Sequence, residues 1–275
     1  MSYLRTAASE ERVKSSIIEN VQVAPRIMRI TLHAPEVART AQPGQFVHLL
    51  CSESGSFDPL LRRPISIHNV RRDSGKVILM YEVRGRGTDL LSRMTEGDTV
   101  DLLGPLGNGF DLPKSSHAKT LVVGGGMGVA PLVFLADELV KRVGCENVHV
   151  HVGYRTESAL ICRDDFELMD ASVRAATEDG SYGATGYVTA LVSEYLDEID
   201  SEDTPTVYAC GPVPMLRAVS KIVCERGFTC LVSLEAKMAC GIGACMGCAV
   251  KVKPDEYVRV CKEGPVFNAD EVVWD

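Results

Sequence analysis

The sequence predicts a β-barrel plus α/β protein: an antiparallel barrel, then a parallel-sheet domain, then a short segment organised around cysteines. Three observations support this. Short apolar runs separated by turn residues fill the first part of the chain, apolar runs alternate with helical patterns in the middle, and four closely spaced cysteines lie near the end. We therefore expect domains over residues 1–115, 116–234 and 235–275.

The composition is that of an ordinary globular protein. Of the 275 residues, 45% are hydrophobic and 24% are charged, and the formal net charge is −8. No apolar run reaches the roughly 20 residues that span a bilayer, and the first residues show no apolar signal region. The negative charge disfavours nucleic acid and anionic membrane surfaces as partners. We expect a cytoplasmic protein whose ten cysteines either bind metal or stay reduced.

The barrel prediction depends on evenly spaced short strands. Turn residues at Pro43-Gly44 and at 73–76 separate them, and a short helix is expected from about Thr88 to Met94. The turn sequence from Gly104 to Phe110 predicts a tight glycine loop near the end of the domain. The expected strands cover residues 13–18, 27–32, 46–50, 65–70 and 77–83.

Two features of this domain suit a phosphate group. Arg62 and Arg63 adjoin an apolar strand, and arginine has a planar fork that matches phosphate oxygens. The sequence from Gly85 to Thr88 opens the short helix, where free backbone N–H groups and a hydroxyl are expected. Each feature alone has an ordinary explanation, because arginine pairs are usually solvated and glycines usually mark turns.

The middle of the chain has the alternation of a parallel sheet covered by helices. Helical patterns are expected at 129–142 and from Pro212 to about Arg226. Each follows an apolar run bounded by turn residues, as in βαβ units. The expected strands cover residues 120–123, 148–152, 173–176, 206–210 and 229–234.

A glycine loop follows the first of these strands and opens a helix, as a phosphate-binding loop requires. Its glycines let a pyrophosphate approach the backbone, and the helix N-terminus favours negative charge. The alternative is a plain strand-to-helix turn. The loop differs from the strict G-x-G-x-x-G pattern because Pro131 replaces the last glycine. The candidate nucleotide contacts are Gly124, Gly125, Gly126, Gly128 and Pro131.

The choice between NAD and NADP stays open at this level. Arg155 follows the second strand and suits a 2′-phosphate, while Glu178 and Asp179 follow the third and suit a free ribose hydroxyl. The spacing of these residues does not decide between the two dinucleotides.

Four cysteines have the spacing of an iron–sulfur site. C-x4-C-x2-C followed by a distal cysteine is the plant-type [2Fe–2S] arrangement. The residues between them are mostly small, so the backbone can wrap closely with its N–H groups inward, and Lys237 adds positive charge nearby. A zinc knuckle fits less well, since structural zinc usually takes two C-x2-C pairs. The expected ligands are Cys240, Cys245, Cys248 and Cys261.

The barrel motifs resemble the flavin domain of the ferredoxin–NADP reductase superfamily. Arg63-Pro64-Ile65-Ser66 is similar to its R-x-aromatic-S motif, which implies that Arg63 contacts the pyrophosphate of FAD and that Ser66 lies by the reactive edge of the flavin. Ile65 stands where many members carry a stacking aromatic. The resemblance implies that the flavin site comprises Arg63, Pro64, Ile65, Ser66, Met80, Tyr81, Glu82, Gly87 and Thr88.

Motifs of the α/β domain resemble the nicotinamide domain of the same superfamily. The loop after the first strand has its G-x-G-x-x-P form, and the sequence from Cys210 to Met215 is similar to its C-G-P-x-x-M element. The resemblance implies that Cys210 lies near the hydride-transfer site, flanked by Gly211 and Pro212. Glu235 is a candidate for a carboxylate found near the flavin in relatives.

The order of the motifs resembles one family in particular, the electron-transfer subunits of NAD-linked dihydroorotate dehydrogenase. That resemblance implies FAD, a [2Fe–2S] cluster and NAD as cofactors, and a separate FMN-containing catalytic subunit as partner in a heterotetramer. Electrons from dihydroorotate would pass through the cluster and FAD to NAD in pyrimidine biosynthesis. Two alternatives remain: the reductase subunit of another flavin and iron–sulfur complex, ferredoxin-, sulfide- or hydrogen-linked, and a non-enzymatic redox sensor.

Overall fold

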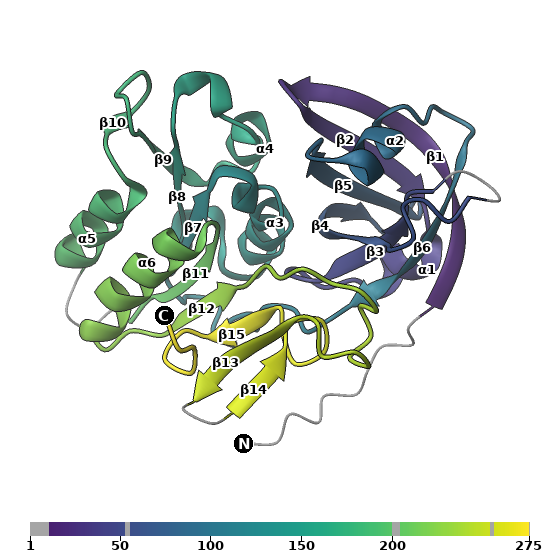
Figure 1. Cartoon of the computed structure of the whole chain (residues 1–275). Coiled ribbons are helices and arrows are strands. Elements are labelled where there is room, and N and C mark those ends of the chain that lie inside the picture. The colour runs from purple at the N-terminus through teal and green to yellow at the C-terminus, as the bar shows by residue number, and fades with distance from the viewer. Residues whose placement is uncertain (1–10, 53–55, 200–203, 254–255, 275) are drawn as a thin grey trace. The chain divides into compact units, whose positions relative to one another are not determined.

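The computed structural model describes residues 11–52, 56–199, 204–253 and 256–274 (Figure 1). These residues form two compact units, described separately below. Of the described residues, those up to Gly109, those of 235–250 and those of 257–265 belong to the barrel unit, and those of 110–234, 251–256 and 266–274 belong to the sheet unit. The first residues, in which the sequence shows no signal region, lie outside the described residues.

The barrel unit contains a closed barrel with strand order β1-β2-β5-β4-β3-β6, and all its neighbouring strands are antiparallel. The long first strand closes the barrel because its first half pairs with β6 and its second half with β2. The predicted antiparallel barrel is confirmed. Its strands are β1 (Glu11–Ala24), β2 (Ile27–His33), β3 (Phe46–Leu50), β4 (Arg63–Arg71), β5 (Lys76–Glu82) and β6 (Thr99–Leu106).

The end of β6 differs from the sequence prediction. Gly104 to Leu106 were expected to begin a glycine loop, but Gly104 pairs with Glu11 of β1 and Leu106 pairs with Phe46 of β3. The backbone therefore continues as a strand because partners on both sides complete its hydrogen bonds. The turn begins only at Gly107, where φ is +74°.

Apolar side chains that alternate along the strands fill the interior of the barrel. The pattern in β2 places Ile30 and Leu32 in the core, each with no exposed surface. Two short helices connect the strands. Helix α1 (Pro35–Thr40) begins at a proline, which a first helical turn tolerates, and α2 (Arg86–Ser92) begins two residues before the expected position.

The sheet unit is built on a seven-stranded sheet in the order β10-β9-β8-β7-β11-β12-β15. Every neighbouring pair is parallel except β12 with β15, so the predicted parallel-sheet domain is confirmed. Figure 1 shows α3 and α4 on one face of the sheet and α5 and α6 on the other. The strands are β7 (Thr120–Gly125), β8 (Val148–Tyr154), β9 (Ser172–Thr177), β10 (Ala184–Thr185), β11 (Thr206–Cys210), β12 (Cys230–Ser233) and β15 (Val266–Asn268).

The helices of this unit follow the strands along the chain. The predicted helices at 129–142 and 212–226 correspond to α3 (Leu132–Val143), preceded by a 3-10 turn over Gly126–Val129, and to α6 (Val213–Glu225). The sequence analysis did not predict α4 (Arg163–Glu167) or α5 (Val188–Glu198). Short 3-10 turns also cover Cys145–Asn147 and Glu157–Ala159.

The strand order creates a switch point between β7 and β11. After β7 the chain adds β8 and β9 on one side, and it then returns to add β11 and β12 on the other. In open α/β sheets, ligands bind outside the carboxyl ends of the strands at such a point. Both candidate nucleotide motifs begin there, because one follows β7 and the other follows β11.

The last part of the chain adds β13 (Ala249–Lys253) and β14 (Glu256–Arg259), which form a two-stranded sheet. Segment 235–275, expected as one subdomain, contributes residues to both units. The exact domain boundaries stay a prediction. Within the described residues, no helix is long and apolar enough to cross a membrane.

Candidate cofactor and cluster sites

Arg63 lies at the start of β4 with its guanidinium against the first turn of α2. Its Nη1 donates to the carbonyl of Leu61 at 2.5 Å. A Cβ atom placed on Gly87 would lie 2.9 Å from the Nε of Arg63, so a larger residue here would push the guanidinium away from the helix. The structure thus brings together two residues predicted for the flavin phosphate, one from a strand and one from a helix start.

Arg62 has a structural role that the sequence did not reveal. Its guanidinium donates to the carbonyl oxygens of His48 at 3.2 Å and Asp101 at 3.0 Å, and to the Asp101 carboxylate at 2.7 Å. Arg12 donates to the same carboxylate at 2.6 Å. Burial opposes ionisation of Asp101, but the hydrogen bonds from both arginines outweigh it and lower the pKa of this carboxyl. Because the Arg62 guanidinium is occupied by these bonds, Arg63 is the member of the pair that can bind a ligand.

Thr88 serves its own helix. Its hydroxyl oxygen accepts hydrogen bonds from the backbone N–H groups of Arg84 at 3.0 Å and Gly85 at 3.2 Å, and it donates to the carbonyl of Gly85 at 3.0 Å. These bonds fix the N-terminus of α2. A role for Thr88 in contacting a phosphate stays a prediction.

The other predicted flavin residues lie on β4 and β5. Pro64, Ile65 and Ser66 are half-buried, whereas the strand is fully buried from Ile67 to Val70. Apart from the exposed terminal Arg71, only the first half of β4 is therefore accessible to a ligand.

On β5, the predicted residues face two ways. Met80 is buried and Glu82 forms an ion pair with Arg84 at 2.6 Å. Tyr81, on the opposite side of the strand, is 2% exposed, and its hydroxyl lies 3.3 Å from the side-chain oxygen of Asn20. A flavin contact through the Tyr81 side chain would require this packing to change.

The two nucleotide motifs pack directly against each other in the sheet unit. A Cβ atom on Gly128 would lie 2.5 Å from the backbone carbon and oxygen of Cys210 and from the nitrogen of Gly211. Since backbone atoms cannot yield as a side chain can, this position requires glycine. Gly126, with φ of +53°, is exposed at the tip of the loop. The structure thus packs the two motifs together at the switch point between β7 and β11, with Gly126 exposed and Gly124, Gly125 and Gly128 buried.

The remaining members of these motifs are mostly structural. Pro131 is buried at the N-cap position of α3, and Cys210 is 2% exposed. Gly125 lies against the side chain of Met215, and Pro212 is exposed at the N-cap of α6. Cys210 therefore offers almost no surface to a ligand.

The residues considered for the choice of dinucleotide are adjacent at the carboxyl edge of the sheet. The N–H of Asp179 donates to the carbonyl of Arg155 at 3.3 Å, and both side chains are exposed. Asp179 accepts hydrogen bonds from the backbone and hydroxyl of Ser181 at 3.0 and 2.6 Å, which lower the pKa of its carboxyl. Glu235 lies just beyond β12 with an exposed side chain.

The four predicted cluster ligands lie in the barrel unit, and each sulfur accepts a backbone hydrogen bond. Three donors come from the loop between them, and the N–H of Cys261 is the fourth. Cys248 and Cys261 are 3% and 2% exposed, whereas Cys245 is exposed and Cys240 is half-buried. The bonds run from Ala244 to Cys240 at 3.3 Å, Gly247 to Cys245 at 3.4 Å, Cys261 to Cys248 at 3.4 Å and Gly243 to Cys261 at 3.2 Å.

This donor set fits an anionic cluster. Left-handed backbone at Gly241 and Gly243, with φ of +72° and +83°, turns the amides of the loop inward, and Met246 also has a positive φ of +59°. Burial opposes ionisation of Cys240, but backbone N–H groups around it outweigh that effect and lower the pKa of its thiol to about 6. Backbone donors of this kind stabilise thiolates, which are the form that binds metal. Cys261 differs, because burial and the neighbouring Cys248 outweigh the N–H of Gly243 and raise the pKa of its thiol to about 12.

His48 is a neighbour of the cluster loop that sequence reasoning missed. It lies on β3 with no exposed surface, and a Cβ on Gly241 would contact its Nδ1. Burial, followed by the charge of Arg62, lowers the pKa of this histidine to about 4, so the ring is neutral. Among the described residues, neither ring nitrogen has a hydrogen-bond partner. The only sequence signal was a histidine in an otherwise apolar strand.

Asn108 is a second missed residue, and it fastens the chain just after the last cluster cysteine. Its side-chain amide donates to the carbonyls of Lys262 at 3.1 Å and Glu263 at 2.9 Å, and its backbone N–H donates to Gly264 at 2.6 Å. The predicted glycine loop therefore holds the cluster segment on the barrel.

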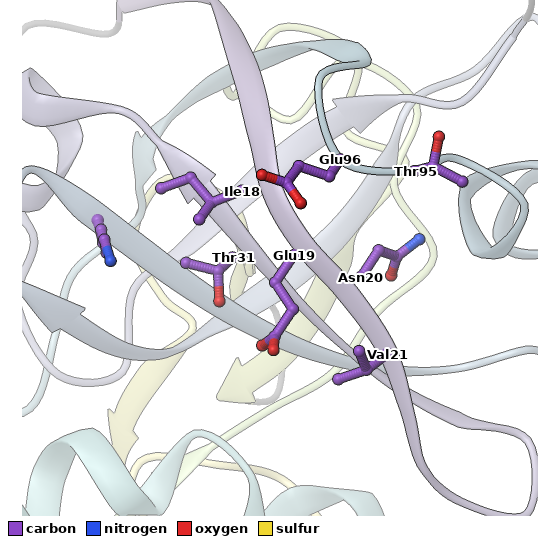
Figure 2. Close-up of a pocket in the computed structure, with 8 residues that line it drawn as sticks. Ile18, Glu19, Asn20, Val21, Thr31, Thr95 and Glu96 are labelled. Atoms are coloured by element: carbon purple, nitrogen blue, oxygen red, sulfur yellow. The ribbon is translucent and has the colours of Figure 1, made fainter.

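A pocket on the outer surface of the barrel holds none of the predicted site residues. Figure 2 shows Glu19 and Asn20 of β1 beside Thr95 and Glu96. The amide of Asn20 donates to the carbonyls of Leu91 at 2.9 Å and Met94 at 2.8 Å, so it secures the end of α2. The lining is completed by Ile18, Val21, Thr31 and Lys76.

Comparisons with known proteins agree with this division of the chain. Residues 235–273 match the family model of the iron-sulfur cluster binding domain of dihydroorotate dehydrogenase B, and residues 122–221 match that of the oxidoreductase NAD-binding domain. A solved structure of an NADH-dependent reduced ferredoxin-NADP oxidoreductase, from work on flavin-based electron bifurcation, is 30% identical with a TM-score of 0.83, covering 98% of this chain and 92% of that one. A ferredoxin NADP+ reductase from Neisseria gonorrhoeae, 18% identical with a TM-score of 0.62, shares the fold.

Fold and site together define a reductase of the ferredoxin–NADP reductase type with an added iron–sulfur-binding segment. Curated relatives narrow the class. The protein of Desulforamulus reducens is 43% identical, over 95% of this chain and 98% of its own, and that of Caldanaerobacter subterraneus subsp. tengcongensis is 39% identical over 96% and 99%. Both are named dihydroorotate dehydrogenase B (NAD(+)), electron transfer subunit. The chain belongs to this family of oxidoreductase subunits.

Proposed function

We propose that this protein is the electron-transfer subunit of an NAD-dependent dihydroorotate dehydrogenase, acting in pyrimidine biosynthesis. It would take electrons from a partner that oxidises dihydroorotate and deliver them to NAD. One observation carries the proposal. The cluster loop and the flavin-motif strand belong to a single compact unit, in which His48 contacts Gly241 and β3 pairs with β4 through Phe46 and Ser66.

The barrel unit would hold FAD and a [2Fe–2S] cluster, and the sheet unit would hold NAD. Bound there, the cluster exchanges single electrons, the flavin one or two, and the nicotinamide a hydride. The cluster ligands are the thiolates of Cys240, Cys245, Cys248 and Cys261. Backbone N–H groups directed at each sulfur favour the ionised thiols.

Arg63 would bind the flavin pyrophosphate from its position on Gly87, while the accessible start of β4 receives the ring system. The Ser66 hydroxyl would lie by the reactive edge, and Ile65 would cover the ring less fully than an aromatic residue. Pro64 fixes the backbone between these contacts. Met80, Tyr81, Glu82 and Thr88 complete the proposed flavin site, in which the Tyr81 side chain would take part only after its packing against Asn20 changed.

Gly124, Gly125, Gly126 and Gly128 would let the NAD pyrophosphate reach the start of α3. Gly211 and Pro212 place the end of β11 against this loop, with Cys210 as the candidate residue at the hydride-transfer position. We favour NAD because the curated relatives carry NAD(+) in their names. The exposed carboxylate of Asp179 agrees with this choice, since it would repel a 2′-phosphate.

The partner would be an FMN-containing catalytic subunit, joined in a heterotetramer. Ile242 and Met246 of the cluster loop are 40% and 50% exposed and suit a protein-facing surface. A cytoplasmic location stays a prediction.

Coexpression with the candidate catalytic subunit tests the proposal. We expect copurification, one FAD and about two irons per chain, and NAD reduction by dihydroorotate only when both subunits are present. Full dihydroorotate-dependent NAD reduction without this chain would refute it, as would zinc without acid-labile sulfide.

A second candidate is the reductase subunit of a flavin-based bifurcating complex, favoured by the TM-score of 0.83 to such an oxidoreductase. It predicts copurification with a larger subunit that carries several clusters. The chain is 43% identical to a dihydroorotate dehydrogenase subunit and 30% identical to the bifurcating oxidoreductase, which favours the first function.

A further inference from the structure

Arg259 and Glu263 form a charged pair beside the cluster loop that the proposed electron path does not use. Arg259 ends β14, two residues before Cys261. Its Nε donates to a carboxylate oxygen of Glu263 at 3.0 Å, and its Nη2 donates to the other. The backbone N–H of Arg259 adds a bond to the same carboxylate at 2.7 Å. Two bonds therefore fix the guanidinium in one orientation on a carboxylate that the backbone N–H also holds.

The free arm of this guanidinium reaches the cluster loop. Its Nη1 donates to the carbonyl of Gly243 at 2.5 Å. That carbonyl belongs to the same peptide group as the N–H of Ala244, which donates to the Cys240 sulfur at 3.3 Å. A donor at the oxygen of an amide polarises the amide and strengthens the bond made by its N–H. One continuous chain thus runs from Glu263 through Arg259 and one peptide group to a cluster ligand.

We propose that Arg259 is a positioning residue that raises the reduction potential of the cluster through the Gly243–Ala244 peptide, with Glu263 holding its guanidinium in place. Reduction adds one negative charge to the cluster. A fixed positive charge and a strengthened N–H···S bond both stabilise the reduced form, because hydrogen bonds to sulfur and local charge set the potential of such centres. The negative charge of Glu263 acts in the opposite direction.

The inference rests on the cluster assignment in the proposed function, and the two can fail separately. Iron and acid-labile sulfide in the wild-type protein test the assignment. The variants described next test the role of Arg259 in protein that carries the cluster.

The test is an EPR-monitored redox titration of the purified full-length holoprotein. Arg259→Gln removes the charge and is expected to lower the equilibrium constant for cluster reduction about tenfold, which is about 59 mV for a one-electron couple. Glu263→Gln is expected to shift the potential in the opposite direction, because it removes a negative charge while its amide oxygen can still accept from Arg259. Arg259→Lys keeps the charge and should recover at least half of the loss.

Arg29→Gln is the matched control for loss of a surface arginine. Arg29 pairs with Glu19 at 3.5 Å on β2, the strand opposite β3 in the barrel order, and solvent screens such exposed charges. The cluster of the Arg29→Gln variant should have the same reduction potential as that of the wild type. If the pair had a purely structural role, Arg259→Gln and Glu263→Gln would shift the reduction potential of the cluster in the same direction or leave it unchanged. Either result overturns the proposal. If the Arg259→Gln protein loses iron, the test depends on Glu263→Gln alone. A raised reduction potential in Glu263→Gln then supports the proposal, and any other result refutes it.

Discussion

Gly241→Ala is expected to release the cluster while the rest of the barrel stays folded. Gly241 has φ of +72°, a conformation that costs a non-glycine residue roughly 1–2 kcal/mol. Its new Cβ would also contact the Nδ1 of His48 and lie 2.9 Å from Cε1. His48 has no exposed surface into which it could move, so overpacking adds roughly 1–3 kcal/mol. The total, about 2–5 kcal/mol, falls on the loop that carries Cys240.

Iron content and visible circular dichroism measure cluster retention, and urea unfolding measures the stability of the barrel. Gly97→Ala separates the cost of backbone strain from the cost of overpacking. Gly97 has φ of +88°, and in the described part of the chain no other atom lies within 4 Å of the added Cβ. It should lose only the roughly 1–2 kcal/mol of backbone strain. The double variant Gly241→Ala/His48→Ala should regain part of the iron. Gly241→Ala protein with full iron and the stability of Gly97→Ala would refute the argument that His48 is a rigid support for the loop.

Three further predictions follow from the sites. Cys248→Ser should lose iron yet keep stoichiometric FAD by absorbance, since the flavin motif uses other residues; FAD loss together with iron would contradict this. Gly128→Ala should raise the KM for NADH at least about tenfold, as its Cβ would lie 2.5 Å from backbone atoms of Cys210, and unchanged diaphorase kinetics would argue against the site. Asp101→Asn should cost about 1–2 kcal/mol at pH 7, because hydrogen bonds to charged groups are lost. The folded-state pKa of Asp101 is lowered, so this difference should be full above about pH 4 and shrink as pH falls below it, and a pH-independent difference in chemical unfolding would refute the assignment.

Features encoded by neighbouring residues were predictable from the sequence. The strands at Phe46–Leu50 and Thr206–Cys210 were predicted at their observed bounds because apolar runs with clear turn signals specify them locally. The four cysteines were recognised as one site because three lie in a single glycine-rich loop. Strand β6 was missed because pairing with β1 and β3 carries it through the glycine and proline that indicated a loop. Helix α5 was missed although its buried residues, Val188, Leu191, Val192 and Leu196, recur at helical spacing.

Contacts between residues far apart in the chain could not be predicted. His48 meets Gly241, and Asn108 meets the chain at Glu263, only because the barrel brings these segments together. No spacing in the sequence encodes such pairs. For the same reason the sequence could not distinguish Arg62, which binds Asp101, from Arg63, which faces the proposed ligand.

The division of the segment after Leu234 between the two units has a consequence for protein engineering. A chain shortened at Leu234 would uncover His48 on β3 and would remove β15, leaving β12 as an unpaired sheet edge. If iron–sulfur segments were exchanged between relatives by a single crossover at this point, the new segment would have to pack against both the barrel unit and the sheet unit of the recipient. A graft should carry matching residues on β3 and β12, because the segment is part of the interior support of both units.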